Sequence, residues 1–270
     1  MATASKLTVL CVAQNCAPYA EVFLRSAAAH GFREAKFSKL ILFVGRSSDG
    51  TEAVCRELAV SMPVPTTVIY AADLPKKDRQ RVAAIQRRNE GHFNEGMWDF
   101  LIQHWGIDTS YYAGIHVDVE FLAPGLWDFL LNRLDQSAVV GIFDPGELIP
   151  GIDHMVLSMP RFFPLVVAAN RQRADSLGLR WSRGSQARRR QRRLEEDNGA
   201  IALQRALASK IALIREEELR PYLKHFGYLW TKTFESPLHH VDGVNSRESV
   251  ALRLAALRSS SDRSLTPAVT

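Results

Sequence analysis

Apolar residues in the first 145 positions form short, nearly uninterrupted runs that alternate with stretches of helical spacing. In those stretches apolar residues return every three or four positions, which predicts helices over Ala17–His30, Thr51–Val60, Lys76–Trp105 and Gly125–Leu134. The runs, each predicted to be a strand, are Lys6–Ala13, Lys39–Val44, Thr66–Tyr70, Tyr111–Val119 and Ala138–Phe143. Strands that alternate with helices predict an α/β protein in which a mostly parallel sheet is flanked by helices.

The pattern becomes less regular after Pro145. The apolar segment Met155–Ala169 fits a strand followed by a helix, and the basic segment Arg171–Arg193 fits neither. A further helix is predicted over Asn198–Ala208 and a further strand over Lys210–Arg215. With no repeat and no clear linker, we expect one domain over residues 1–257 and a disordered, serine-rich tail over 258–270.

The segment Tyr111–Leu122 combines an apolar run with alternating polar residues. On a continuous strand His116, Asp118 and Glu120 would project from one side and the intervening valines from the other. Buried carboxylates are costly unless they meet a cation or a hydrogen-bond partner. This acidic strand end therefore suggests a metal or catalytic site.

A second polar segment, Ser47–Thr51, follows the second predicted strand. In parallel sheets ligands bind beyond the carboxyl ends of the strands. Since Ser47–Thr51 and His116–Glu120 both follow such ends, we expect them to border one crevice.

Four short motifs occur in a particular order along the chain. They are Val12-Ala13-Gln14-Asn15, Ser48-Asp49-Gly50-Thr51, Arg88-Asn89-Glu90-Gly91 and His116-Val117-Asp118-Val119-Glu120. In this order the chain resembles the GT-A glycosyltransferases, most closely the family-2 type, over roughly residues 6–215. The resemblance implies a Rossmann-like GT-A fold, with a donor half at about 6–145 and an acceptor half at about 146–257. It also implies an enzyme of the hexosyltransferase type that uses UDP- or GDP-sugars to build glycans or polysaccharides.

The resemblance implies a divalent cation, Mn²⁺ or Mg²⁺, at the DxD-like motif. Asp118 would bind the cation, which bridges the donor diphosphate. His116 replaces the first acid of the motif, and is either a ligand, a contact to the donor, or a structural histidine. A second alignment takes Asp118 and Glu120 as the acidic pair, and His240 is a candidate for an additional late ligand.

The donor-binding residues implied by the resemblance lie in all four motifs and directly after the second strand. Asp49 has an alternative, structural interpretation as part of a turn that starts a helix. Arg46 stands near the place where the family often has a base-binding acid, and is expected to meet a phosphate instead. The predicted donor contacts are Gln14, Asn15, Arg46, Asp49, Arg88, Asn89, His116 and Asp118.

The acidic residues Glu195-Glu196-Asp197 resemble the family's catalytic-base motif. We expect Asp197, or else Glu196, to accept the proton of the acceptor hydroxyl in an inverting transfer. Two alternatives stay open: a retaining enzyme similar to fungal mannosyltransferases, and a catalytically inactive GT-A domain that serves as a binding module.

Composition narrows the remaining possibilities. The chain is 46% hydrophobic and 23% charged, which suits a globular protein with a sizeable core. The chain has three cysteines and no CxxC pair, which indicates reduced structural thiols. The first apolar run is better explained as a strand than as a signal peptide. We therefore expect a cytoplasmic protein. The arginine-rich run 188–193 fits a loop over anionic ligands or a peripheral contact with an anionic membrane, and nucleic acid is disfavoured.

Overall fold

The computed structural model describes residues 6–35, 37–88, 93–105, 107–144, 161–181, 211–226 and 246–264. Its centre is a seven-stranded sheet with the strand order β3-β2-β1-β4-β7-β6-β8. All of these strands run parallel except β7, which is antiparallel to both of its neighbours. Their bounds are β1 Leu7–Ala13, β2 Ser38–Val44, β3 Thr66–Tyr70, β4 Tyr111–His116, β6 Val139–Asp144, β7 Arg161–Asn170 and β8 Ile211–Ile214.

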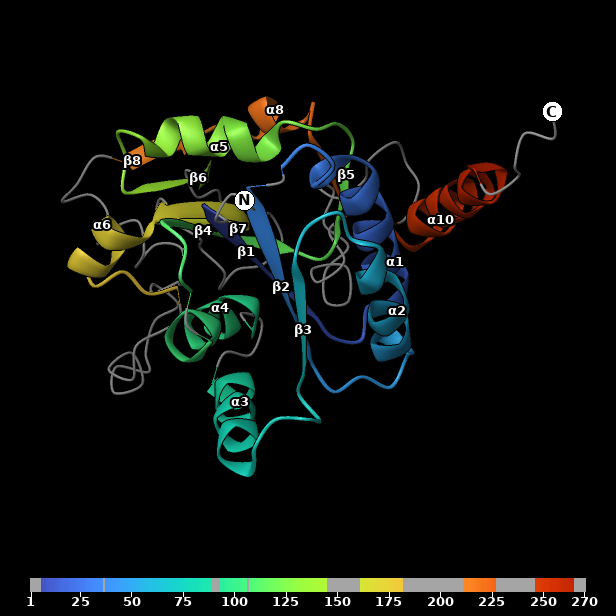
Figure 1. Ribbon diagram of the computed structural model, residues 1–270, viewed down its shortest axis with the longest axis horizontal. Helices are drawn as coiled ribbons and strands as arrows, with labels where there is room; N and C mark the ends of the chain where they lie inside the picture. The colour runs from blue at the N-terminus through green and yellow to red at the C-terminus, as the bar shows by residue number, and fades with distance from the viewer. Residues whose placement is uncertain are drawn as a thin grey trace, which may run out of the picture.

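Helices cover both faces of this sheet (Figure 1). Alternate residues of β1 belong to different cores: Val9 packs with one set of helices and Leu10 with the other. The first set is α1 Ala17–Ser26, α2 Thr51–Leu58, α5 Leu126–Leu134, α8 Glu216–Leu219 and α10 Ser246–Ser264. The second is α3 Lys76–Arg88, α4 Phe93–His104 and α6 Arg171–Ser176. The predicted mostly parallel α/β sheet flanked by helices is therefore confirmed.

The predicted strand Tyr111–Val119 needs a correction. β4 ends at His116, and the chain bends before a separate strand, β5 Val119–Phe121, which pairs with β9 Leu223–His225 in a two-stranded sheet. The reason is tertiary: the backbone N–H of Phe226 donates to the carbonyl of Asp118, and β9 draws the chain away from the main sheet. The expected simple alternation of His116, Asp118 and Glu120 along one strand is therefore wrong.

Two other expectations are corrected in the later part of the chain. Residues 161–170 form β7, so the helix expected at the end of the segment Met155–Ala169 is absent there. Helix α10 continues to Ser264, so residues 258–264 are not the disordered tail expected from their serine content. The helix is held by buried Val250 and Leu254, and by the guanidinium of Arg258, which meets a carboxylate of α1.

The three cysteines are buried free thiols: Cys11, Cys16 and Cys55. Burial raises the pKa of the Cys55 thiol to about 12, which keeps it protonated and unreactive at neutral pH. Within the described residues no helix is both long and apolar enough to span a bilayer.

Candidate functional site

The candidate site lies at the carboxyl edge of the sheet, around the central strand β1. β2 and β3 lie on one side of β1, and β4 lies on the other. The chain therefore switches from one side of β1 to the other between β3 and β4. The registers align Val12 of β1 with Phe43 of β2 and with His116 of β4. The segments that follow these three strands therefore emerge side by side, where open α/β sheets bind their ligands.

The loops after β1 and β2 are locked together by side chains. Asn15 adopts a left-handed conformation with φ of 48°, which asparagine tolerates better than most residues. Its side-chain oxygen accepts a hydrogen bond of 2.9 Å from the backbone N–H of Ser48, and its own N–H donates to the Ser47 hydroxyl at 3.0 Å. Asn15, a predicted donor contact, thus joins the two loops.

Asp49 completes this lock. One carboxylate oxygen accepts from the hydroxyl and the N–H of Thr51 at 2.6 and 3.2 Å, and the other accepts from the N–H of Ala17 at 3.0 Å. Although burial alone would raise the pKa of Asp49, the hydrogen bond from the Thr51 hydroxyl and those from backbone N–H groups lower it. Both oxygens thus serve the turn and the start of α1, which fits the structural alternative for Asp49.

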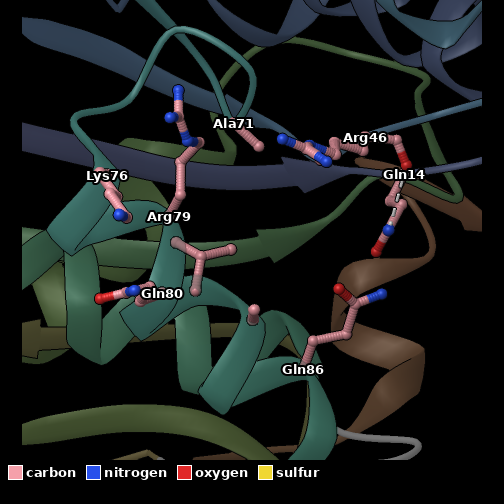
Figure 2. A pocket seen from close by; sticks show the side chains of 10 residues that line it. Gln14, Arg46, Ala71, Lys76, Arg79, Gln80 and Gln86 are labelled. Carbon is pink, nitrogen blue, oxygen red and sulfur yellow. Dashed lines mark hydrogen bonds between the residues drawn. The ribbon is translucent and has the colours of Figure 1, made fainter.

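A pocket of about 390 Å³ opens between the strand ends and α3. Figure 2 shows Gln86 on α3 across from Gln14, and the guanidinium of Arg46 extending toward Ala71. Among the described residues that line the pocket, none is acidic and three are cationic. The described lining residues are Gln14, Gly45, Arg46, Ala71, Lys76, Arg79, Gln80, Val82, Ala83 and Gln86. The pocket is therefore suited to a ligand that carries negative charge.

Gln14 and Gly45 form one wall of this pocket by close approach. The side-chain amide of Gln14 donates to the carbonyl of Arg46 at 3.2 Å. A β-carbon added at Gly45 would lie 3.0 Å from atoms of the Gln14 side chain. Glycine therefore lets Gln14 lie flat over the end of β2, with Arg46 directed to the pocket.

Asp118 is the central charged residue at the other end of the edge. It is 2% exposed, and its two oxygens lie 3.8 Å from His116 Nδ1 and 3.3 Å from His225 Nε2. Burial alone would raise the pKa of Asp118, but the charge and hydrogen bond of His225, with the charge of His116, outweigh burial and hold the pKa well below its usual range. A carboxylate that stays ionised between two imidazoles is chemically suited to a cation.

His116 is packed as well as paired. Its ring centroid lies 5.7 Å from the ring of Trp98 on α4. Trp98 approaches this closely because Gly114, two residues earlier on the same face of β4, has no side chain: a β-carbon there would lie 2.6 Å from the indole. The Gly114–Trp98 contact therefore fixes one side of the imidazole.

Glu120, the other predicted acidic ligand, makes a different contact. It is 1% exposed, and Arg253 of α10 donates to it at 2.5 Å. Among the described residues, no group of three or more His, Cys, Asp or Glu side chains is arranged to hold a metal ion. The structure thus brings His116, Asp118 and His225 together, and pairs Glu120 with an arginine.

Several predicted site residues cannot be placed. Arg88 is the last residue of α3, and its side chain is outside what the structure describes. Asn89, Glu196, Asp197 and His240, and the arginine run 188–193, also lie outside the described residues.

The sequence reasoning missed His225, Lys76 and Arg79. The two cations follow the third predicted strand at helical spacing, a signal that was present in the sequence. His225 had no comparable signal, because its position depends on the pairing of β9 with β5.

Comparisons with known proteins come mainly from solved structures. No protein-family model and no curated protein matches the sequence. Staphylococcus aureus TarS matches at 9% identity and a TM-score of 0.49, over 86% of this chain but only 40% of TarS. A mannosyltransferase from Pyrobaculum calidifontis, solved with GDP-Man and Mn²⁺, matches at 13% identity and a TM-score of 0.49, over 94% of this chain and 70% of that one.

Mouse xyloside xylosyltransferase 1 matches at 13% identity and a TM-score of 0.41, over 62% of this chain and 68% of that one. Two of these three neighbours are named as sugar transferases.

Proposed function

We propose that this protein is a metal-assisted glycosyltransferase that moves a sugar from a nucleotide-sugar donor to a hydroxyl acceptor. The observation that carries the proposal is the buried Asp118 carboxylate between two histidines, at the same sheet edge as a pocket lined by cations. The order of the four motifs along the chain supports the same assignment.

The nucleotide would occupy the pocket at the ends of β1, β2 and β3. Arg46, Lys76 and Arg79 supply positive charge there, and guanidinium groups match phosphate oxygens in geometry and charge. The amide groups of Gln14 and Gln86 can donate to or accept from a base or ribose. The sugar would then lie toward Asp118, along the same edge.

The side chains around Asp118 are of the types that bind divalent cations, and the donor would supply the remaining ligands of a shared cation. Asp118 offers one carboxylate, and His225 and His116 offer imidazole nitrogens on either side of it. Mn²⁺ and Mg²⁺ in nucleotide sites are commonly held by one or two carboxylates together with substrate phosphates, so a complete protein cage is not required. When bound, the cation would stabilise the negative charge that develops on the leaving diphosphate.

In the transfer itself, the acceptor oxygen would bond to the anomeric carbon as the bond from that carbon to the diphosphate breaks. Asp197 is our candidate to accept the acceptor's proton, with Glu196 as the alternative. Attack opposite the leaving group would invert the anomeric centre. Arg46 and the two α3 cations would hold the departing nucleotide in place.

A second candidate is a GT-A domain that binds a nucleotide but does not catalyse transfer. The observations that favour it are His116 in place of an acid and the lack of a three-ligand group among the described residues. A retaining enzyme is a third alternative, and activity that survives Asp197→Asn would favour it over inversion.

The proposal is tested by the thermal stability of the full chain with Mn²⁺ and with UDP, GDP, CDP or ADP. A ligand that binds only the native state raises the free energy of unfolding by about 2.7 kcal/mol when its concentration is a hundred times its dissociation constant. The melting temperature then rises as well. We expect a rise with at least one nucleotide, and a larger rise when Mn²⁺ is present. No rise with any nucleotide would exclude both the enzyme and the binding module.

A further inference from the structure

Helix α10, at the far end of the chain, is joined to the strand that follows Asp118. Nε of Arg253 lies 2.5 Å from Oε1 of Glu120 on β5, across 133 positions of sequence. The carboxylate side chain is 2% exposed and the arginine side chain 42%. Removing the guanidinium of Arg253 would leave the buried carboxylate of Glu120 without this charge partner. Such a loss destabilises a protein far more than the loss of an exposed ion pair.

Strand β5 is short and depends on such contacts for its position. It has three residues and lies outside the main sheet, and β9 is its one partner among the described strands. The N–H of Phe121 donates to the Ser26 hydroxyl at 3.0 Å, and the carbonyl of Asp118 accepts from the N–H of Phe226 at 2.9 Å. Glu120 is the middle residue of this strand, and Asp118 directly precedes the strand. The ion pair of Glu120 therefore holds in place the segment that brings Asp118 close to His225 of β9.

We propose that Arg253 is a positioning residue: through Glu120 it holds β5 so that Asp118 and His225 keep the spacing a cation needs. The inference rests on the proposed function, since it assigns a cation to Asp118. It makes the C-terminal helix a structural part of the donor site.

The same helix supplies a matched control. Arg258 donates to both oxygens of Glu21 on α1 at 2.8 and 2.5 Å, and Glu21 is also buried. Glu21 lies in α1, not in β5. Arg258→Ala therefore removes an arginine–glutamate contact of α10 without touching the strand next to Asp118, and Arg25 still donates to Glu21.

Two explanations for an effect of Arg253 predict opposite signs. If Arg253 acted only through its positive charge, Arg253→Ala would make the site more negative and Mn²⁺ would bind more tightly. If it positions Asp118, the same change weakens binding, because partners that orient metal ligands typically contribute about 10- to 100-fold to metal affinity. Arg253→Lys keeps the charge but not the planar guanidinium, so only positioning predicts an effect.

The experiment is a titration of the full chain with Mn²⁺, in which electron paramagnetic resonance measures the free ion, in the presence and absence of UDP or GDP. Thermal unfolding of each variant is followed in parallel by circular dichroism. We expect Arg253→Ala to weaken Mn²⁺ binding by about tenfold or more. Arg253→Lys should weaken binding less, and Arg258→Ala should leave it within about twofold of the wild type even where its melting temperature falls.

Unchanged or tighter Mn²⁺ binding by Arg253→Ala overturns the inference, as does equal weakening by Arg258→Ala. If Arg253→Ala does not fold, Arg253→Lys decides: wild-type affinity in that variant overturns positioning. A wild-type chain that takes up no Mn²⁺ with either nucleotide overturns the proposed function instead, and that result differs from a selective effect of Arg253.

Discussion

Two carboxylates at the same edge of the sheet have very different surroundings. Asp49, after β2, accepts hydrogen bonds from the backbone N–H groups of Ala17 and Thr51 and from the Thr51 hydroxyl. Asp118, after β4, lies between the imidazoles of His116 and His225. Asp49 is exposed and Asp118 is buried.

The partners distinguish a structural acid from a candidate catalytic one. Backbone donors cannot change their charge or leave, so the contacts of Asp49 stabilise one loop conformation. Imidazoles can lose a proton and bind a metal, so the surroundings of Asp118 can change when a cation arrives. Burial adds to this contrast, because a cation near Asp118 is less screened by water than one near Asp49.

The largest expected effect comes from Asp118→Asn. The amide keeps the shape of the side chain but removes the negative charge, so a cation loses its one carboxylate ligand. If the cation contributes several kcal/mol to catalysis, turnover of the nucleotide sugar should fall by at least about a hundredfold. Steady-state kinetics at saturating Mn²⁺ measure this change, and a fall of less than about threefold would contradict the role of Asp118.

An intermediate effect is expected from the double substitution Lys76→Ala, Arg79→Ala in the pocket. A charge-assisted hydrogen bond contributes about 1.5–3 kcal/mol, so the loss of even one of the two should lower the affinity for a nucleoside diphosphate about tenfold or more. Calorimetric titration measures the affinity, and the difference should shrink at high salt.

Lys77→Ala is the control for this change, because Lys77 is exposed on the same helix and does not line the pocket. An equal loss of affinity in Lys77→Ala would mean that the helix acts only through its general charge.

A smaller effect, and one on a different property, is expected from Asp49→Asn. The amide nitrogen would face a backbone N–H or the Thr51 hydroxyl, and the loss of such turn and capping bonds costs about 1 kcal/mol of stability. Urea unfolding measures this loss. Mn²⁺ affinity should stay at the wild-type value, and a tenfold loss of that affinity would instead support the donor-binding interpretation of Asp49.

The smallest effect concerns pH. The hydrogen bond from Arg258 lowers the pKa of Glu21 despite its burial. The folded pKa then lies below the unfolded value of about 4.3, so the stabilisation is complete above that value and is lost as the pH falls through the folded pKa. The free energy of unfolding should therefore decrease between about pH 5 and pH 3, and less steeply in Arg258→Ala. Because Arg25 also donates to Glu21, an equal slope in that variant would show that Arg258 does not lower the pKa of Glu21.

The sequence was sufficient for the sheet because its strands are long apolar runs with helices between them. β1, β2, β3 and β6 appear within a residue or so of their predicted bounds, since each corresponds to a local apolar or β-branched run of the sequence. The reversed direction of β7 and the break after His116 were not predictable in the same way, because both depend on pairing between distant segments.

The candidate site shows the same division. Asp118 and Arg46 were predicted from motifs that are local in sequence, and both lie at the expected edge. His225 and Arg253 reach that region only through β9 and α10, whose positions depend on tertiary contacts. Glu120 illustrates the limit: local alternation made it a metal candidate, and a contact 133 positions away gave it an arginine partner.

The most direct test of the proposed glycosyltransferase is the release of nucleoside diphosphate from a panel of UDP- and GDP-sugars by the full chain with Mn²⁺ and no added acceptor. We expect slow hydrolysis of at least one donor, which stops when Mn²⁺ is chelated and is lost in Asp118→Asn. If no donor in the panel is hydrolysed, or if hydrolysis is the same in Asp118→Asn, Asp118 does not mark the donor site of a glycosyltransferase.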